Sequence, residues 1–399
     1  MQRIVLCAAA LFLVTLIAAC GGSGSSTAAL TKYDRPAKYV SYSSTKLHPM
    51  GGAMQGVPLN LQQGVVSTLA GTAGTIGFVN YTGTASSSVA RFNQPNDITT
   101  YDGSTYYIAD YGNSAIRQIT SAGVVTTMKF TDAATLLPVT FSRPTAITTD
   151  GTNLYVADSG LNVVRVIDLL DNSVITIGSA TDPAGSVDSA VKADVRFNQP
   201  TGITTDGVNI YVADYGNRTV RWIKDTGAGD YAVYTMAGAP GVIGTTANTP
   251  TRPEDARFSL PSRITTDGKF LYLTDIGNRT ICKIDIITGY VTTIAGASGA
   301  LGLDNGTLDG FGTAARFNQP NGITSDGSSL YVTDSYHNSV RVIDDLGGLY
   351  LVSTLSLPAG SLHFPLGITT NGVSLFIADP FTLKLDVYTY SNSIIKISN

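Results

Sequence analysis

One pattern occurs six times along this chain of 399 residues and constrains its fold more than any other feature. Each copy contains a proline, an isoleucine three residues later, an Asp-Gly or Asn-Gly pair, and an apolar run that ends in aspartate. The repeat prolines are Pro95, Pro144, Pro200, Pro261, Pro320 and Pro365. They lie about 54 residues apart on average, which suits one four-stranded sheet with its turns.

The residues within a copy alternate between apolar and polar, a period of two that is typical of β-strands. The Asp-Gly pairs predict tight turns between these strands. A single sheet of four strands cannot bury both of its faces, so six such sheets must pack against one another around an axis. The sequence therefore predicts an all-β protein, a six-bladed β-propeller of four-stranded antiparallel blades.

The two ends of the repeat region predict how the ring closes. Residues 65–71 have the pattern of a fourth strand before the first complete copy, whereas 394–397 have that of the third strand of the last copy. The N-terminal strand is therefore expected to complete the last blade, which leaves few free sheet edges. The propeller is expected to span residues 63–399.

The repeat resembles a known family. Residues 197–207, Phe-Asn-Gln-Pro-Thr-Gly-Ile-Thr-Thr-Asp-Gly, and 211–221, Tyr-Val-Ala-Asp-Tyr-Gly-Asn-Arg-Thr-Val-Arg, are similar to the NHL repeat, which forms six-bladed propellers. This resemblance implies the fold but not the function, because propellers include lyases, lactonases and binding modules. In the last copy the shortened motif His363-Phe364-Pro365 predicts that Phe364 joins the repeat phenylalanines in the core.

Residues that recur in the copies are expected to serve the scaffold. An aspartate ends the second strand of each copy, where its carboxylate can accept N–H groups of the following turn. An arginine precedes the repeat phenylalanine in four copies and is expected to bind carboxylates or carbonyls between blades. These four are Arg91, Arg196, Arg257 and Arg316.

The N-terminal residues predict export and a lipid anchor in the membrane. Residues 1–19 combine a charged start, an apolar stretch and small residues, as in a signal peptide. Ile17-Ala18-Ala19-Cys20 resembles a bacterial lipobox, which implies lipidation of Cys20 and, with Gly21 following, sorting to the outer membrane. Residues 20–62 have the composition of a flexible tether. The side of the outer membrane and the oligomeric state stay open.

Charge and cysteine content exclude other classes. The formal net charge is −4 and no basic run occurs, which argues against a nucleic acid partner. The cysteines provide no disulfide framework, because Cys7 leaves with the signal peptide, Cys20 carries lipid and Cys282 then has no partner. His337 and His363 occupy different positions in their copies and are expected to be turn or surface residues.

Residues that break the repeat are the candidates for function. The two positions after each repeat proline lead toward the central channel, and they include Asn96, Asp97, Arg263 and Asn321. The segments with Asn96 and Asn321 are similar to the Pro-Asn-Gly segments through which gluconolactonase- and paraoxonase-type propellers hold a catalytic calcium ion. That similarity implies a calcium site with Asn and Asp oxygens as ligands, although no glutamate near an innermost strand completes it.

A second group of candidates lies on the rim. Long connections between copies share one face with the turns between second and third strands, and function usually sits on such loops. The connections are 72–89, 179–194, 239–255 and 297–314. The turns add aromatic residues suited to peptide or sugar, namely Tyr111, Tyr215, Tyr336 and Phe381.

The sequence favours a lipid-anchored binding module for a protein, peptide or glycan in the cell envelope, without a cofactor or chemistry of its own. The alternative is a calcium-dependent lactonase or hydrolase with Asn96, Asp97 and Asn321 at the channel mouth. A purely structural envelope component differs from the first only in lacking a defined ligand. An enzyme needs converging carboxylates or histidines on the innermost strands, where this chain offers Asp97 alone.

Overall fold

The computed structural model describes residues 59, 61, 65–71, 75–82, 89–246, 250–297, 308–380, 382–384, 387–389 and 393–398. The chain divides into residues 1–42 and 43–399, and every described residue belongs to the second unit. The predicted signal peptide, the tether up to residue 58, Cys20 and Phe381 lie outside the described residues. No described helix is both long and apolar enough to cross a bilayer.

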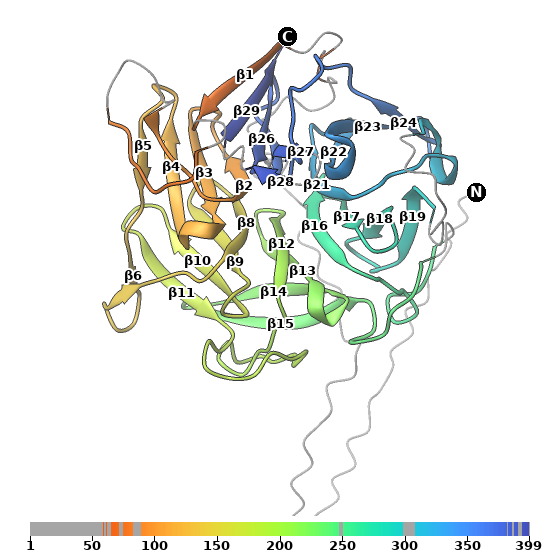
Figure 1. The fold of residues 1–399 in the computed structure, drawn as a ribbon. Helices are drawn as coiled ribbons and strands as arrows, with labels where there is room; N and C mark the ends of the chain where they lie inside the picture. The colour runs from red at the N-terminus through yellow and green to blue at the C-terminus, as the bar shows by residue number, and fades with distance from the viewer. Residues whose placement is uncertain are drawn as a thin grey trace, which may run out of the picture. The chain divides into compact units, whose positions relative to one another are not determined.

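Six sheets surround a central axis, as Figure 1 shows. Blade I contains β2 (Pro95–Thr100), β3 (Thr105–Asp110), β4 (Ala115–Thr120) and β5 (Val125–Thr127). Blade II contains β8 (Pro144–Thr149), β9 (Asn153–Asp158), β10 (Val163–Asp168) and β11 (Ser173–Ile177). Blade III contains β12 (Pro200–Thr205), β13 (Asn209–Asp214), β14 (Thr219–Gly227) and β15 (Asp230–Ala237).

The other three blades repeat this order from the axis outward. Blade IV contains β16 (Pro261–Thr266), β17 (Phe270–Asp275), β18 (Thr280–Asp285) and β19 (Val291–Ala295). Blade V contains β21 (Pro320–Ser325), β22 (Ser329–Asp334), β23 (Ser339–Asp345) and β24 (Tyr350–Thr354). Blade VI contains β25 (Ile368–Thr370), β26 (Leu375–Asp379), β29 (Ser393–Ser398) and β1 (Val65–Ala70).

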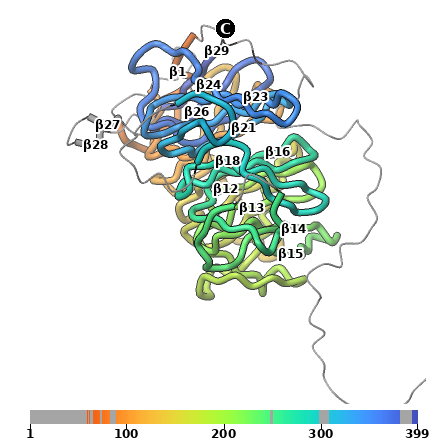
Figure 2. Tube along the Cα trace, turned by 90° about the vertical axis from the view of Figure 1, so that its right-hand side faces the viewer, coloured from red at the N-terminus to blue at the C-terminus, as the bar shows by residue number. Residues whose placement is uncertain are grey.

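The predicted fold class and ring closure are confirmed. The strand β1 pairs antiparallel with β29, with Val66 opposite Ile397 and Thr68 opposite Ile395, and lies beside it in both views (Figures 1 and 2). The last blade is thereby completed by the first strand of the chain. This closure joins the two ends of the repeat region in one sheet, so the ring cannot open without breaking that ladder.

Extra strands extend two blades beyond the predicted four. A hairpin of β6 (Phe130–Asp132) and β7 (Pro138–Val139) follows blade I in the chain but adds to blade II, where β6 pairs in parallel with β11. The short strand β20 (Gly310–Phe311) adds to β24 of blade V. A separate hairpin, β27 (Thr382–Lys384) with β28 (Val387–Thr389), is inserted between β26 and β29. All of these extra strands lie in connections between the repeated strands, where the repeat has no pattern that could predict them.

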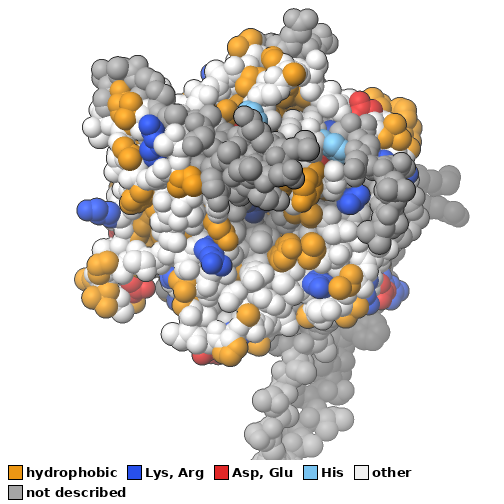
Figure 3. All heavy atoms as spheres, viewed as in Figure 1, with side chains coloured by type: hydrophobic (Ala, Val, Ile, Leu, Met, Phe, Trp, Pro, Cys, Tyr) orange, Lys and Arg blue, Asp and Glu red, His pale blue; other side chains and the backbone are white. Residues whose placement is uncertain are grey.

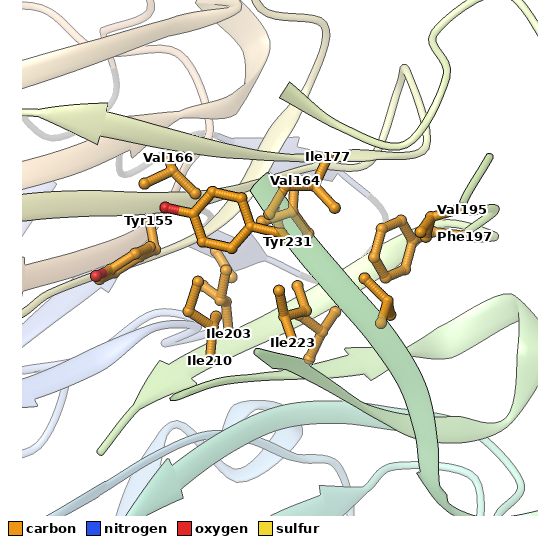
Figure 4. Close-up of a cluster of buried hydrophobic side chains, with 14 residues drawn as sticks. Tyr155, Val164, Val166, Ile177, Val195, Phe197, Ile203, Ile210, Ile223 and Tyr231 are labelled. Atoms are coloured by element: carbon orange, nitrogen blue, oxygen red, sulfur yellow. The ribbon is translucent and has the colours of Figure 1, made fainter. Parts of the chain in front are cut away.

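The hydrophobic core consists of clusters between neighbouring blades. Figure 4 shows the cluster between blades II and III, where Tyr155 and Val164 of one blade meet Ile203 and Ile223 of the next. Phe197, from the connection between these blades, is buried in the same cluster. Each sheet therefore buries both faces against its neighbours, which is the packing that the isolated repeat cannot achieve.

The expected core position of Phe364 was wrong. Phe92, Phe141, Phe197, Phe258 and Phe317 are all buried, but in the last copy the buried residue three positions before the proline is Leu362, while Phe364 is partly exposed. Phe364 has a φ of 73°, the left-handed conformation that Gln94, Arg143 and Gln199 adopt before their prolines. The sixth copy is therefore full length, with leucine in place of phenylalanine.

This correction predicts a contrast between two neighbouring truncations. Leu362→Ala should lower the free energy of unfolding by about 2–5 kcal/mol, because it leaves a cavity in the core. Phe364→Ala should lower it by only about 1 kcal/mol, since that ring loses mainly one aromatic contact. Urea unfolding measures both, and a larger loss for Phe364→Ala would restore the original alignment.

Buried aspartates join the strands of each blade. Asp214, at the end of β13, is fully buried and accepts a hydrogen bond from the Asn198 backbone N–H at 2.8 Å. It also accepts the Arg221 guanidinium of β14 at 2.8 Å. Equivalent aspartates accept N–H groups from the segment before the innermost strand. Asp275 also accepts a backbone N–H of the turn after it, from Asn278. The predicted scaffold role is correct, but the main donors precede the blade.

In the hydrogen bonds of the described residues, the arginines before the repeat phenylalanines bind carbonyls or a carboxylate of the connection that precedes their own blade. Arg91 donates to the carbonyls of Val89 and Ala90. Arg257 donates likewise to Glu254 and Ala256. Inter-strand charge pairing comes instead from arginines on the third strands, of which Arg117, Arg221 and Arg341 are fully buried.

Candidate functional site

One face of the ring carries the elements that the sequence selected, and we call it the loop-rich face. The turn after β3 approaches the connection before β2, because the Gly112 N–H donates to the Asn93 carbonyl at 2.8 Å. Blade II repeats this contact between Gly160 and Ser142. A Cβ on Gly160 would lie 2.1 Å from the Ser142 carbonyl oxygen, so the close approach requires glycine. Turns and connections therefore share this face.

The innermost strands are irregular where they begin on the loop-rich face. Pairing between the first and second strands shifts register directly after the repeat proline in blades I to V, for example between Pro95 and Asp97. Such bulges redirect side chains and are common next to functional sites. The candidate residues Asn96, Asp97, Arg263 and Asn321 all lie in these segments.

Two opposite blades place charged residues at this point, and the other blades leave room for them. The second position after the proline is Asp97 in blade I and Arg263 in blade IV, but glycine or alanine in the other four blades. A Cβ on Gly367 of blade VI would lie 2.1 Å from Asp97 Oδ1. The small residues thus let both charged side chains pack inside the ring, where Asp97 is 7% and Arg263 is 5% exposed.

Arg263 crosses from blade IV to the opposite blade. Its guanidinium donates to Asn96 Oδ1 at 2.6 Å and to the Asn96 carbonyl at 3.1 Å. It also donates to the Thr201 carbonyl of blade III. Asn321 lies beside this strand, where its Oδ1 accepts the Ser262 hydroxyl at 3.4 Å. The structure therefore brings together four of the residues selected from the sequence.

Burial controls the charge of Asp97. Burial raises the pKa of Asp97 to about 6, while the Arg263 charge and the backbone N–H groups of Ile147 and Ile98 act against this rise. Its Oδ2 accepts the Ile147 N–H at 3.0 Å, a contact to blade II. Burial likewise lowers the pKa of Arg263, and the Asp97 charge opposes that shift. The charges of Asp97 in blade I and Arg263 in blade IV thus interact across the ring.

The residues proposed as calcium ligands do not fit a calcium ion. The oxygens of Asn96, Asp97 and Asn321 already accept hydrogen bonds, and a guanidinium cation lies on Asn96. A divalent cation here would have to displace or repel Arg263. Among the described residues, no three His, Cys, Asp or Glu side chains come close enough together to hold a metal ion.

The rim tyrosines are not brought together. Tyr111, Tyr215 and Tyr336 lie in the turns of blades I, III and V, with one blade between each pair. Tyr336 is 54% exposed and meets Phe364 edge-on, with ring centroids 5.3 Å apart. Burial raises the pKa of Tyr215, which is partly covered. Each tyrosine therefore offers a separate contact on the loop-rich face.

Two histidine side chains are visible on the face viewed in Figure 3. The two described histidines each contact a buried aspartate. His337 Nδ1 lies 3.1 Å from Asp334 Oδ2, and His363 Nδ1 lies 3.4 Å from Asp379 Oδ2. The hydrogen bond to Asp379 raises the pKa of His363. His337 occupies the place that asparagine holds in the turns of blades I, III and IV, consistent with its expected turn position. His363 lies in the segment before the innermost strand of blade VI.

Sequence reasoning missed three residues of this face. Phe364 was assigned to the core, and Thr201 was not selected from the positions after the repeat prolines. Arg218, which follows Tyr215 in its turn, was passed over as part of a repeat. Arg218 has a left-handed backbone, with a φ of 58°, at the end of this turn.

The fold is a six-bladed β-propeller, as the sequence predicted, and the chain is similar in sequence to a protein named for NHL repeats. No protein-family model matches the chain. It is 29% identical to NHL repeat-containing protein 2 of Bos taurus over 149 residues, which cover 35% of this chain and 20% of that protein. It is 27% identical to the chloroplastic protein SUPPRESSOR OF QUENCHING 1 of Arabidopsis thaliana over 228 residues, which cover 54% of this chain and 20% of that protein.

The chain thus spans about a fifth of the length of these curated relatives. Among solved structures, an auxiliary nutrient binding protein from Bacteroides ovatus has a TM-score of 0.57 and 14% identity. The match covers 84% of this chain and 77% of that protein. At this identity the likeness establishes the fold.

Proposed function

We propose that this protein is an exported, lipid-anchored binding module whose loop-rich face binds a peptide, protein or glycan in the cell envelope. Cys20 would carry the lipid, residues 20–62 would form the tether, and the propeller would be the ligand-binding part. The observation that carries the proposal is the Arg263 bridge to Asn96, which occupies the channel mouth where propeller enzymes of the calcium type need a metal. Binding must then occur over the face itself.

Two further observations support this proposal. The loop-rich face presents exposed aromatic surface at Tyr336 and Phe364, and aromatic rings supply contact area at low entropic cost. The auxiliary nutrient binding proteins from Bacteroides ovatus and Bacteroides thetaiotaomicron share the fold and are named for binding.

A glycan and peptide array tests the proposal with matched variants of the full-length protein. Tyr336→Ala with Tyr111→Ala alters the loop-rich face, and Val208→Ala with Val373→Ala removes exposed side chains from strand turns on the opposite face. We expect the first pair to reduce array binding about tenfold or more, and the second pair to leave it unchanged. Binding that only the second pair reduces would contradict the proposal.

The calcium alternative is tested by metal removal. We expect the unfolding temperature to be the same with calcium and with chelator, because the Arg263 guanidinium already donates to the Asn96 oxygens that calcium would need. Differential scanning calorimetry together with metal analysis measures this. A stoichiometric metal whose removal lowers the unfolding temperature, with the effect lost in Asn321→Ala, would favour the lactonase.

A further inference from the structure

We propose that Arg143, Arg218 and Arg279 form a binding site for the carboxylates of an acidic oligosaccharide on the loop-rich face. This inference rests on the proposed function and names the chemical class of its ligand. The three arginines belong to blades II, III and IV, and we call them the arginine arc.

Arg218 and Arg279 occupy corresponding places in blades III and IV, and Arg143 occupies a different place, in blade II. Arg218 and Arg279 end the turns after β13 and β17, and Arg143 stands directly before the proline that begins β8. All three have left-handed backbones, with φ values of 58°, 57° and 60°. An arginine pays a steric cost in this conformation, where asparagine or glycine is usual.

In blades II and V the place of Arg218 and Arg279 holds an asparagine that serves the scaffold. In blade II, Asn162 accepts the N–H of Gln199 at 2.7 Å, and in blade V, Asn338 accepts the N–H of Phe364 at 2.7 Å. Both contacts join one blade to the next. Arginine has no acceptor and cannot make this bond, so Arg218 and Arg279 replace a scaffold contact with a charge.

The charges of the arc are not neutralised within the described part of the chain. The ion pairs of the described residues involve other arginines, including Arg196 with Asp182 and Arg221 with Asp188, and none includes an arc residue. The Nε of Arg218 is buried and has no hydrogen-bond partner among the described residues. Arg143 is exposed, and Arg218 and Arg279 are half-exposed, so solvent or a ligand can reach all three.

The two faces of the ring therefore differ in charge. On the opposite face the first turn of each of five blades holds an aspartate, namely Asp102, Asp150, Asp206, Asp267 and Asp326. In Figure 3, basic side chains are spread from the middle of the viewed face to its edge, and the few acidic ones lie toward the edge. The chain has a net charge of −4, yet this face would attract an anion.

The arrangement fits a ligand that repeats its anionic groups. One small anion cannot contact guanidinium groups from three blades, whereas a chain of uronic acids presents a carboxylate at each unit. Guanidinium groups recognise carboxylates with two parallel hydrogen bonds. Tyr215, in the same turn as Arg218, adds apolar area for a sugar ring. A stiff oligosaccharide also loses less conformational entropy on binding than an acidic peptide of equal length.

Titration calorimetry with oligogalacturonate and the full-length protein tests this inference. We expect binding that weakens as salt rises, and no binding of a neutral maltooligosaccharide of the same length. Arg218→Gln and Arg279→Gln should each weaken binding about tenfold, and the double variant about hundredfold. Lys269→Gln, which removes a charge from an exposed side chain on the opposite face, should change nothing.

Three results would contradict the proposal that an acidic glycan is the ligand. These are no binding of oligogalacturonate, equal binding by the wild type and the arc variants, and tighter binding of oligoglutamate of the same length. If a ligand from the array still requires Tyr336 and Tyr111 for binding, that result supports the proposed function and excludes only the arginine site. Circular dichroism checks that the variants fold, as expected for side chains without ion pairs in the described chain.

Discussion

Replacing Arg221 with leucine is expected to lower the free energy of unfolding by about 3–5 kcal/mol, because it leaves a buried carboxylate without its cation. Arg221 is fully buried and donates to Asp214 at 2.8 Å, to Asp188 at 2.7 Å and to the Arg196 carbonyl at 2.9 Å. Its guanidinium also lies 5.1 Å from the centre of the Phe197 ring. Urea unfolding at neutral pH measures the loss.

Blades IV and VI, which lack this arginine, show why blade III cannot compensate for the loss of Arg221. They hold Cys282 and Ile395 where Arg221 stands in β14. In those blades the aspartate has other donors: Asp275 accepts the N–H groups of both Ser259 and Leu260, and Asp379 is contacted by the imidazole and N–H of His363. Among the hydrogen bonds of the described residues, Asp214 accepts only one backbone N–H, from Asn198.

A matched variant at a more exposed arginine separates the effect of burial on the free energy of unfolding from the effect of losing the charge. Arg196→Gln removes an arginine that pairs with the partly exposed Asp182 and should cost less than about 1 kcal/mol. The double variant Arg221→Leu with Asp214→Asn should recover part of the loss, because no buried charge is then left unpaired. A loss for Arg221→Leu as small as that for Arg196→Gln would contradict the expectation.

A chain that begins at Gly71 lacks β1 and is expected to lose about 5 kcal/mol of unfolding free energy, at roughly 1 kcal/mol for each ladder hydrogen bond. The deletion exposes the outer edge of β29, where Ile394 and Ile397 are fully buried in the intact ring. It also removes Leu61, which is 3% exposed and packs in the core cluster of blades V and VI. Unfolding and size-exclusion chromatography report stability and aggregation.

A chain that begins at Val57 is the control for this deletion. It loses the N-terminal residues but keeps β1, so its stability should equal that of the full-length protein. Adding a peptide of residues 57–70 in trans should restore most of the stability of the shorter chain, because the peptide can rebuild the ladder. Equal stability of the two truncated chains would contradict a closing role for β1.

The repeat predicted much of this fold because each copy solves the same local problem. Period-two alternation, turn residues and the proline spacing are local properties, so the blades and their order could be read from the chain. The closure by residues 65–71 was also predictable, since one strand was missing at one end and spare at the other. The alignment of Phe364 failed because leucine and phenylalanine are interchangeable in a core, which hides the register.

The sequence by itself determined the strands, the sixfold repeat, the closing strand and which positions break the pattern. Only the tertiary structure decided what those positions do. Arg263 reaches Asn96 across 167 residues of chain, and small residues in the other four blades make room for the crossing. Contacts of this kind depend on ring geometry and on the volume left by distant glycines, and neither leaves a periodic trace in the sequence.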